Sequence, residues 1–262
     1  MEYVYNVSIV CGLIKTNIFS QEIFHKERIP AGSHEENYAL EEISMNKNLS
    51  EWEKNYGHDA IKISYLNCRS LVNRFDNVKA DVGLRQSDIL VLAETWIQNT
   101  FEVDRFELDD YEVHLNSTGR GKGLAVFYKM HVERVADHNE DNINITKLEL
   151  TKMDVIAVYR SADGTWDSLT NKLSEILNLS KTTMVVGDMN ICNMKKPENK
   201  LKRLLEGVGF KEVVREATHI DGGYLDQAYV LDLGSVKDVV VQLVPKYYSD
   251  HDALCIIYKL DL

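Results

Sequence analysis

The stretch TTMVVGDMN, residues 182–190, is an apolar run that ends in two polar side chains. An apolar run bounded by turn residues predicts a buried strand. Asp188 and Asn190 follow this run with one residue between them, so a carboxylate and a carboxamide stand where the predicted strand stops. Because Gly187 carries no side chain, we expect it to let the chain leave the sheet sharply. The stretch therefore predicts a buried strand with a polar site at its end.

Similar runs recur from residue 61 onward and alternate with helical patterns. Short segments rich in Val, Ile, Leu, Tyr and Phe predict strands: IKISYLN (61–67), DILVLAET (88–95), GLAVFYK (123–129), ITKLEL (145–150), DVIAVYR (154–160), TTMVVGD (182–188) and ALCIIYK (253–259). Apolar residues at helical spacing predict helices within residues 75–85, 166–177 and 201–205. This alternation predicts an α/β protein with helices packed on sheets.

The composition is that of a globular protein with an acidic surface. The 262 residues are 44% hydrophobic and 27% charged, and the formal net charge is −11. Such a charge argues against a general polyanion binder that relies on a basic surface. It is compatible with an enzyme of nucleic acids, because bound divalent cations offset acidic side chains where a phosphate sits. One basic cluster is present, for which a solvated helix face is at least as good an interpretation as a DNA contact: Lys195, Lys196, Lys200, Lys202 and Arg203.

Cysteine usage and hydropathy indicate the compartment. The four cysteines lie far apart and form no CxxC pair, which is typical of reduced core thiols in an intracellular protein. No apolar run reaches the ~20 residues that a membrane span requires. The N-terminus lacks the basic start of a secretory signal. We expect an intracellular, nuclear protein with no membrane partner.

Residues 1–57 differ from the rest of the chain. After a short apolar stretch they are polar and acidic with few aliphatic residues, which is typical of a linker with at most a short helix. We place a boundary near Gly57 and His58. This predicts an N-terminal extension over residues 1–57 and one α/β domain over residues 58–262.

Several other predicted strands also end in polar residues. The first ends in Asn67, the second in Glu94, and DVIAVYR in Tyr159 and Arg160. Later polar residues lie beside the last apolar strands: Asp226, Ser249, Asp250 and His251. In α/β folds, ligands bind beyond the strand ends, where loops project polar side chains from a rigid base.

Each of these residues has a simpler explanation when it is taken singly. A lone Asn or Asp at a strand end is usually a turn former, and Tyr159 and His251 are equally compatible with packing or surface positions. Together, however, they suit a hard cation and a phosphate. Carboxylate and carboxamide oxygens are the ligands of Mg²⁺. An Asp beside an Asn can orient and deprotonate a water, and a His paired with a buried Asp can face a phosphate.

The order of the motifs LN, AETW, YR, GDMN, LDQ and YSDHDAL resembles the endonuclease/exonuclease/phosphatase superfamily, which includes pancreatic deoxyribonuclease and the abasic-site endonucleases. The resemblance spans about residues 61–260. The longer stretches around these motifs are most similar to the endonuclease domains of mobile elements, especially non-LTR retrotransposons: LNCRSL, SDILVLAETWI, RGKGLAVFYK and ATHIDGGYLDQAYV. The resemblance implies a four-layer α/β sandwich of the deoxyribonuclease type, with two packed mixed β-sheets flanked by helices and the site on one rim.

The resemblance also implies roles for the polar residues. Asn67 and Glu94 correspond to the metal site, with Glu94 as the direct ligand of Mg²⁺ or Mn²⁺, and Asp250 lies close to the metal. Five residues correspond to the groups that perform hydrolysis: Asp188 activates water, Asn190 orients it, Tyr159 contacts the phosphate, His251 faces the phosphoryl oxygens, and Asp226 holds His251.

Substrate contacts are implied for Thr218, Arg160 and Ser249. The chain departs from the family pattern at Met189, where an aromatic is usual, and at Gln227, where a histidine is usual. The loop YRSADG lacks the usual prolines. None of these departures removes a catalytic group, so we expect an active enzyme.

The segment YVYNVSIVCGLIKTNIFSQE within the extension resembles the closing segment of helicases carried by some rolling-circle transposons. This implies a chain linked to a helicase, or to a reverse transcriptase, in a larger polyprotein, or a remnant of one.

These features predict an Mg²⁺-dependent endonuclease of mobile-element origin that nicks DNA and leaves 3′-hydroxyl and 5′-phosphate ends. Two alternatives stay open from the sequence. One is a phosphatase or phosphodiesterase of the same superfamily that acts on a small phosphorylated substrate. The other is a domesticated DNA-binding module without catalytic activity.

Overall fold

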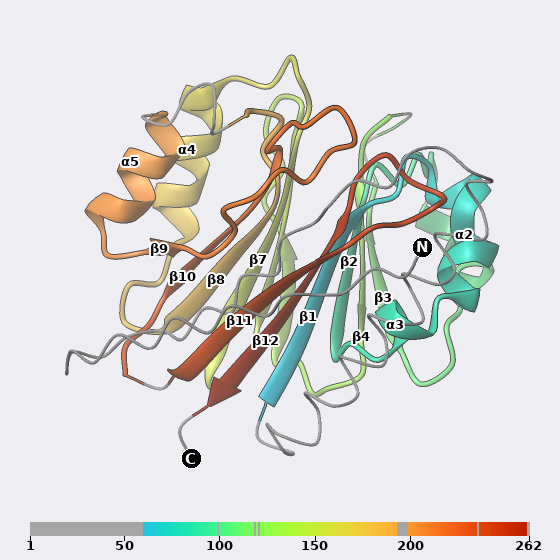
Figure 1. Ribbon diagram of the computed structural model, residues 1–262, viewed down its shortest axis with the longest axis horizontal. Coiled ribbons are helices and arrows are strands. Elements are labelled where there is room, and N and C mark those ends of the chain that lie inside the picture. Colours follow the sequence, from blue (N-terminus) through green and yellow to red (C-terminus); the bar gives the residue numbers. More distant parts are fainter. Residues whose placement is uncertain are drawn as a thin grey trace, which may run out of the picture.

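Two six-stranded sheets form the centre of the protein (Figure 1). The computed structural model describes residues 60–98, 100–117, 119, 121–192, 199–234 and 236–260. The predicted extension, residues 1–57, and its boundary lie outside these ranges. Within them, every helix is too short or too polar to span a lipid bilayer.

Each sheet is mixed, with one parallel pair and otherwise antiparallel neighbours. The first sheet has the order β11 (Val236–Val244), β12 (Ala253–Leu260), β1 (Ala60–Asn67), β2 (Ile89–Ala93), β4 (Leu124–Tyr128) and β3 (Glu112–Asn116). The second has the order β5 (Arg134–Asp137), β6 (Ile143–Glu149), β7 (Met153–Arg160), β8 (Thr182–Asp188), β10 (Asp226–Leu231) and β9 (Lys211–Glu212).

The parallel pairs need crossover connections, and helices supply them. The helices α2 (Leu71–Ala80) and α3 (Val82–Arg85) connect β1 to β2, and α4 (Trp166–Ile176) connects β7 to β8. A 3₁₀ helix, η2 (Thr100–Arg105), and α5 (Lys200–Gly207) follow β2 and β8. Figure 1 shows α2 and α3 outside one sheet and α4 and α5 outside the other.

The central strands, such as β2 (ILVLA), are rich in apolar residues because both faces of each sheet are buried. In β1, Ile63 and Tyr65 belong to the core between the sheets, whereas Leu66 packs with Leu71 and Val78 of α2. The second sheet packs on its helices through a separate cluster that includes Leu169, Leu173, Leu201 and Leu205. The four-layer α/β sandwich predicted from the sequence is therefore confirmed.

The structure adds elements that the apolar runs did not predict. The strands β3, β5, β9, β10 and β11 are short or carry polar residues. The helix predicted near residues 75–85 is divided at Asp81, whose Oδ1 accepts the Leu84 N–H at 3.0 Å and begins α3. A buried ion pair at 2.7 Å joins Asp81 Oδ2 to Lys246 Nζ, and Tyr248 donates to the same oxygen. This attaches the loop before β12 to the α2–α3 junction.

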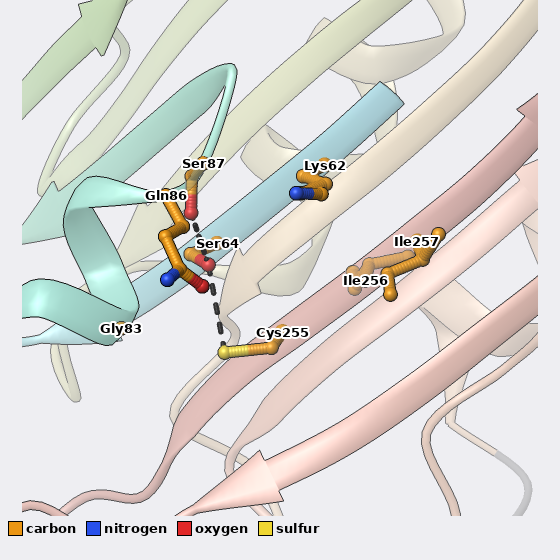
Figure 2. A pocket seen from close by; sticks show the side chains of 8 residues that line it. All are labelled: Lys62, Ser64, Gly83, Gln86, Ser87, Cys255, Ile256 and Ile257. Atoms are coloured by element: carbon orange, nitrogen blue, oxygen red, sulfur yellow. Dashed lines mark hydrogen bonds between the residues drawn. The ribbon is translucent and has the colours of Figure 1, made fainter. Parts of the chain in front are cut away.

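A small cavity of about 20 Å³ lies against α3 on the helix side of the first sheet (Figure 2). Ser87 Oγ donates to Ser64 Oγ at 2.6 Å, and Ser64 Oγ lies 3.5 Å from Cys255 Sγ. Burial raises the pKa of the Cys255 thiol, so this cysteine is unreactive. The space is enough for about one water molecule.

Gly187 has a different role from the one predicted. The strand β8 does not leave the sheet there: it continues to Asp188, and Gly187 pairs with Val158 of β7. A Cβ at position 187 would lie 1.9 Å from the Val158 carbonyl oxygen. Glycine is therefore required by the close approach of two strands, directly beside the polar end of β8.

We expect Gly187→Ala to be strongly destabilising, because the clash is with backbone that is fixed on both sides by the sheet. Overpacking a core costs ~1–3 kcal/mol or more, which corresponds to a melting temperature several degrees lower. Thermal unfolding followed by circular dichroism measures the effect, and Gly207→Ala, where a Cβ meets nothing within 4 Å, is the control. Equal melting temperatures for the two variants would show that β7 and β8 can separate.

Candidate active site

Polar residues from both sheets meet at one rim of the sandwich, where β1, β2, β7 and β8 end. The parallel pair β1–β2 brings Asn67 beside the end of β2, which Glu94 follows. The parallel pair β7–β8 brings Tyr159 beside Asp188, and the antiparallel partner of Asp188 on β10 is Asp226. The strand-end residues predicted from the sequence thus lie together, as parallel strands require.

Asn67 links the two sheets through its buried side chain. Its Nδ2 donates to Glu94 Oε1 at 3.0 Å and to Asp188 Oδ2 at 2.9 Å. Its Oδ1 accepts the Arg69 N–H at 3.1 Å, which determines the orientation of the amide. Asn67 therefore holds two carboxylates from different sheets close to each other.

Asp188 is almost completely buried, with 1% of its surface exposed. Its Oδ1 accepts the Asn190 N–H at 2.7 Å, and its own N–H donates to the Tyr65 hydroxyl at 2.8 Å. Burial, and next the charge of Asp226, raise the pKa of the Asp188 carboxyl to about 7. A pKa near neutrality suits a group that accepts a proton during catalysis.

Tyr159 and Glu94 form the side of the site that faces the first sheet's loops. The Tyr159 hydroxyl lies 3.2 Å from Glu94 Oε1 and 3.1 Å from the Gly121 carbonyl. Burial, and next the charge of Glu94, raise the pKa of Tyr159 far above its usual value, so the hydroxyl keeps its proton and acts as a donor. Glu94 has a left-handed φ of 51°, which is uncommon for this residue type and is found mainly at functional sites.

Asp226 and His251 form a buried pair on the opposite side. His251 Nδ1 lies 2.8 Å from Asp226 Oδ2. Burial lowers the pKa of His251, but the charge and hydrogen bond of Asp226 outweigh this and raise it to about 9. The imidazole is therefore protonated at neutral pH. Ligand atoms of Asp188, Asp226 and His251 all lie within 4.8 Å of one another.

Two of the predicted substrate contacts have structural hydrogen bonds. Thr218 is fully buried, and its hydroxyl accepts the N–H of Asp226 at 3.0 Å. Ser249 donates to the Asn67 carbonyl at 2.6 Å and accepts the His251 N–H at 3.1 Å. Both hydroxyls position catalytic residues, and their substrate contacts stay predictions.

Arg160 lies behind the site and is nearly buried. Its guanidinium donates to the carbonyls of Met189 at 2.7 Å and Asn190 at 2.9 Å, and it stacks 4.1 Å from the Trp166 ring centroid. Arg160 thereby holds Asn190 in its left-handed conformation, with φ 49°. These bonds favour a structural role for Arg160 over a direct contact with substrate.

Asp250 contacts a guanidinium and an imidazole rather than other carboxylates. Its Oδ2 lies 2.6 Å from Arg69 Nη1 and 3.2 Å from His219 Nε2. The His219 ring packs edge-to-face on His251 with centroids 4.8 Å apart. Sequence reasoning missed Arg69, His219 and Tyr65, although Tyr65 and Arg69 stand two residues on either side of Asn67.

The donor set of the site fits a hard divalent cation. Glu94, Asp188 and Asp226 bring carboxylates to one rim, and Asn67 adds a carboxamide. Asp226 Oδ1 is buried and has no hydrogen-bond partner among the residues that the structure describes. A buried carboxylate oxygen without a donor is costly, and a cation relieves that cost. All-oxygen ligands of this kind suit hard cations such as Mg²⁺, Ca²⁺ and Mn²⁺ better than softer metals.

Two lysines of the basic cluster lie on α5 and pair with neighbouring acids. Lys200 pairs with Asp167 at 2.5 Å, and Lys202 pairs with Glu212 at 2.9 Å. Lys195 and Lys196 lie outside the described residues. The two paired lysines favour the solvated helix face over a DNA contact.

Comparison with solved structures shows the same fold. A 3′ phosphatase from Neisseria, NExo, bound to a product DNA hairpin is 18% identical with a TM-score of 0.62, over 77% of this chain and 100% of that one. An AP endonuclease from Archaeoglobus fulgidus is 20% identical with a TM-score of 0.57, over the same shares. The endonuclease domain of TRAS1, a telomere-specific non-LTR retrotransposon, is 15% identical with a TM-score of 0.56, over 77% of this chain and 99% of that one.

A search of curated proteins by sequence found no match. The model of the endonuclease/exonuclease/phosphatase family, in contrast, matches residues 64–251, a range that begins within β1, extends past the end of β11 and includes every predicted site residue. The chain therefore belongs to the endonuclease/exonuclease/phosphatase family.

Proposed function

We propose that this chain is a Mg²⁺-dependent endonuclease of mobile-element origin that nicks DNA. The observation that carries the proposal is the convergence of Asp188, Asn67 and the Asp226–His251 pair at one rim. Support for DNA as the substrate comes from the solved structures of similar fold, which include an AP endonuclease and a phosphatase bound to a DNA hairpin. Support for a mobile-element origin comes from the residues within the sequence motifs and from the structural similarity to the TRAS1 endonuclease domain.

Glu94 and Asn67 would hold the metal, with Mn²⁺ as an alternative to Mg²⁺. When bound, a divalent cation supplies charge to the phosphate and to the oxygen that leaves. In the residues themselves, Asn67 already fixes the Glu94 carboxylate by its hydrogen bond at 3.0 Å. The same amide group restrains Asp188, so both carboxylates keep their places before substrate arrives.

Asp188 is the base of the proposed reaction. It accepts a proton from the attacking water as the water oxygen bonds to phosphorus and the bond from phosphorus to the 3′ oxygen breaks. Asn190, whose N–H is already bonded to Asp188, orients this water. The protonated His251, held by Asp226, faces the phosphoryl oxygens and balances their charge. The Tyr159 hydroxyl donates to Glu94 Oε1 or to the Gly121 carbonyl in this structure, and it would turn its hydrogen to the phosphate when substrate binds.

A comparison of substrates tests the proposal. The purified chain is given a labelled DNA duplex, a duplex with a 3′-phosphate, and an inositol phosphate, each with Mg²⁺. We expect internal cleavage of the duplex to be the fastest reaction. Faster release of inorganic phosphate from either phosphomonoester would make the chain a phosphatase, and tight DNA binding without any hydrolysis would make it a binding module.

The proposed domain boundary leads to a second prediction. A chain that begins at residue 58 should cleave DNA at the rate of the full chain, because every proposed catalytic residue lies between residues 67 and 251. Cleavage rates and melting temperatures of both chains measure this. A shortened chain that is folded but inactive would show that residues 1–57 contribute to the site.

A further inference from the structure

Arg69 is an exposed cation beside the carboxylates of the rim. Its side chain is 57% exposed, whereas the guanidinium of Arg160 is buried against main-chain carbonyls. The rim gathers the carboxylates of Glu94, Asp188, Asp226 and Asp250, and the whole chain carries a net charge of −11. A phosphodiester that approaches this rim meets several negative charges, and the exposed guanidinium of Arg69 is placed to offset them.

Backbone hydrogen bonds to the proposed metal-site residues fix the position of Arg69. The Arg69 N–H donates to Asn67 Oδ1 at 3.1 Å, and the next N–H, of Ser70, donates to the Glu94 carbonyl at 2.7 Å. Arg69 and Ser70 have left-handed φ values of 44° and 92°. Such a conformation persists only where the surroundings impose it. The side chain of Arg69 is thus directed from a rigid point beside Asn67.

Asp250 holds the other end of the Arg69 side chain. Arg69 Nη1 donates to Asp250 Oδ2 at 2.6 Å across 181 positions of sequence. His219 stabilises the same oxygen from the far side: its Nδ1 accepts the Asp221 N–H, so its Nε2 carries the proton and donates to Asp250. One guanidinium nitrogen contacts Asp250, and a guanidinium has five N–H donors in a fixed fork. The others can therefore contact a phosphate.

We propose that Arg69 binds a substrate phosphate and that Asp250 is a positioning residue for Arg69, not a ligand of the metal. This inference rests on the proposed function only for the nature of the substrate, a phosphodiester. The Asp250–Arg69 contact at 2.6 Å supports it, because a carboxylate oxygen that already holds two donors is a poor additional ligand for a cation. The competing role uses Asp250 Oδ1, which is buried without a hydrogen-bond partner among the described residues.

DNA binding without turnover tests the proposal. All variants carry Asp188→Asn to prevent cleavage, and the probe is a fluorescein-labelled DNA duplex, measured by anisotropy in Mg²⁺ and in EDTA. We expect Arg69→Gln to weaken binding roughly tenfold to a hundredfold, as for loss of a charged hydrogen bond. The slope of the logarithm of DNA affinity against the logarithm of salt concentration should decrease in magnitude by about one, because one phosphate contact is lost. Arg69→Lys should restore the salt dependence but only part of the affinity, because lysine lacks the bidentate fork.

The matched control is Arg74→Gln, which replaces an exposed arginine in the first turn of α2 and should bind as well as the parent. Asp250→Asn should weaken binding, and combining it with Arg69→Gln should add nothing further. Mn²⁺ affinity, measured by electron paramagnetic resonance, should be unchanged by Asp250→Asn.

Two results would overturn the proposal. One is equal DNA affinity for Arg69→Gln and Arg74→Gln. The other is a loss of Mn²⁺ affinity in Asp250→Asn together with independent effects of the two substitutions, which would assign Asp250 to the metal. Neither depends on nicking, so a parent chain that binds DNA through Arg69 but fails to cut it would contradict the proposed function alone.

Discussion

Asp188→Asn is expected to lower kcat at least about a hundredfold, since a general base contributes ~10²–10⁴-fold. The substitution keeps the size of the side chain and removes its basicity. Asp188 is buried among residues of both sheets, and burial with the Asp226 charge raises the pKa of its carboxyl to about 7. The substitution also removes a negative charge close to the proposed position of the phosphate. Because this relieves repulsion between the carboxylate and the phosphate, DNA affinity should be unchanged or higher. Single-turnover cleavage of a labelled duplex measures the rate.

The variant should remain folded, although not without cost. Asp188 accepts hydrogen bonds through both oxygens, from the Asn190 N–H and from Asn67 Nδ2, and asparagine offers only one oxygen. An unsatisfied buried donor costs ~1–3 kcal/mol, which the lost repulsion from Asp226 partly offsets. Asp221→Asn is the control, because the Asp221 side chain is 87% exposed, and it should cleave normally. A folded Asp188→Asn fraction with normal specific activity would make Asp188 a structural residue.

Glu94→Gln is expected to raise the Mg²⁺ concentration needed for cleavage by roughly tenfold to a hundredfold or more. Removing only an outer hydrogen-bond partner of a metal ligand already lowers metal affinity by about that factor. The amide oxygen of glutamine can still accept from Asn67 Nδ2 and from the Tyr159 hydroxyl, as Glu94 Oε1 does. The substitution therefore removes the charge and keeps the geometry. We expect an unchanged melting temperature without metal.

Titration of the cleavage rate with Mg²⁺ measures this effect. Glu107→Gln, which replaces an exposed acid in the loop before β3, is the control and should need no additional metal. If Glu94→Gln reached the full rate at the same Mg²⁺ concentration as the parent, another carboxylate would have to be the ligand.

Much of the fold could be predicted because its strands are buried on both faces. The strands β1, β2, β4, β6, β7, β8 and β12 appear in the sequence as runs rich in apolar residues, and all were predicted. The strand β3 contains His114 and Asn116, and β5 contains only two apolar residues, so neither has such a run. The division at Asp81 depends on a side chain that caps α3 and pairs with Lys246, far along the chain.

The candidate site was predictable as a set of strand ends but not as a set of contacts. The positions of Asn67, Glu94 and Asp188 follow from parallel pairing at one rim. In contrast, the bond from Arg69 to Asp250 joins residues that are remote in sequence, and the tautomer of His219 depends on the Asp221 N–H. The role of Gly187 was wrongly predicted because the need for a glycine lies in the neighbouring strand, at the Val158 carbonyl.

The measurement that tests the central claim most directly is the conversion of supercoiled plasmid to open circles by the purified chain. The account predicts nicking with Mg²⁺, none with EDTA, and none above background with the Asp188→Asn variant under the same conditions. The nicks should carry 3′-hydroxyl ends that a DNA polymerase extends. Plasmid that stays supercoiled with Mg²⁺ and the parent chain, or nicking by Asp188→Asn at the parent rate, would contradict it.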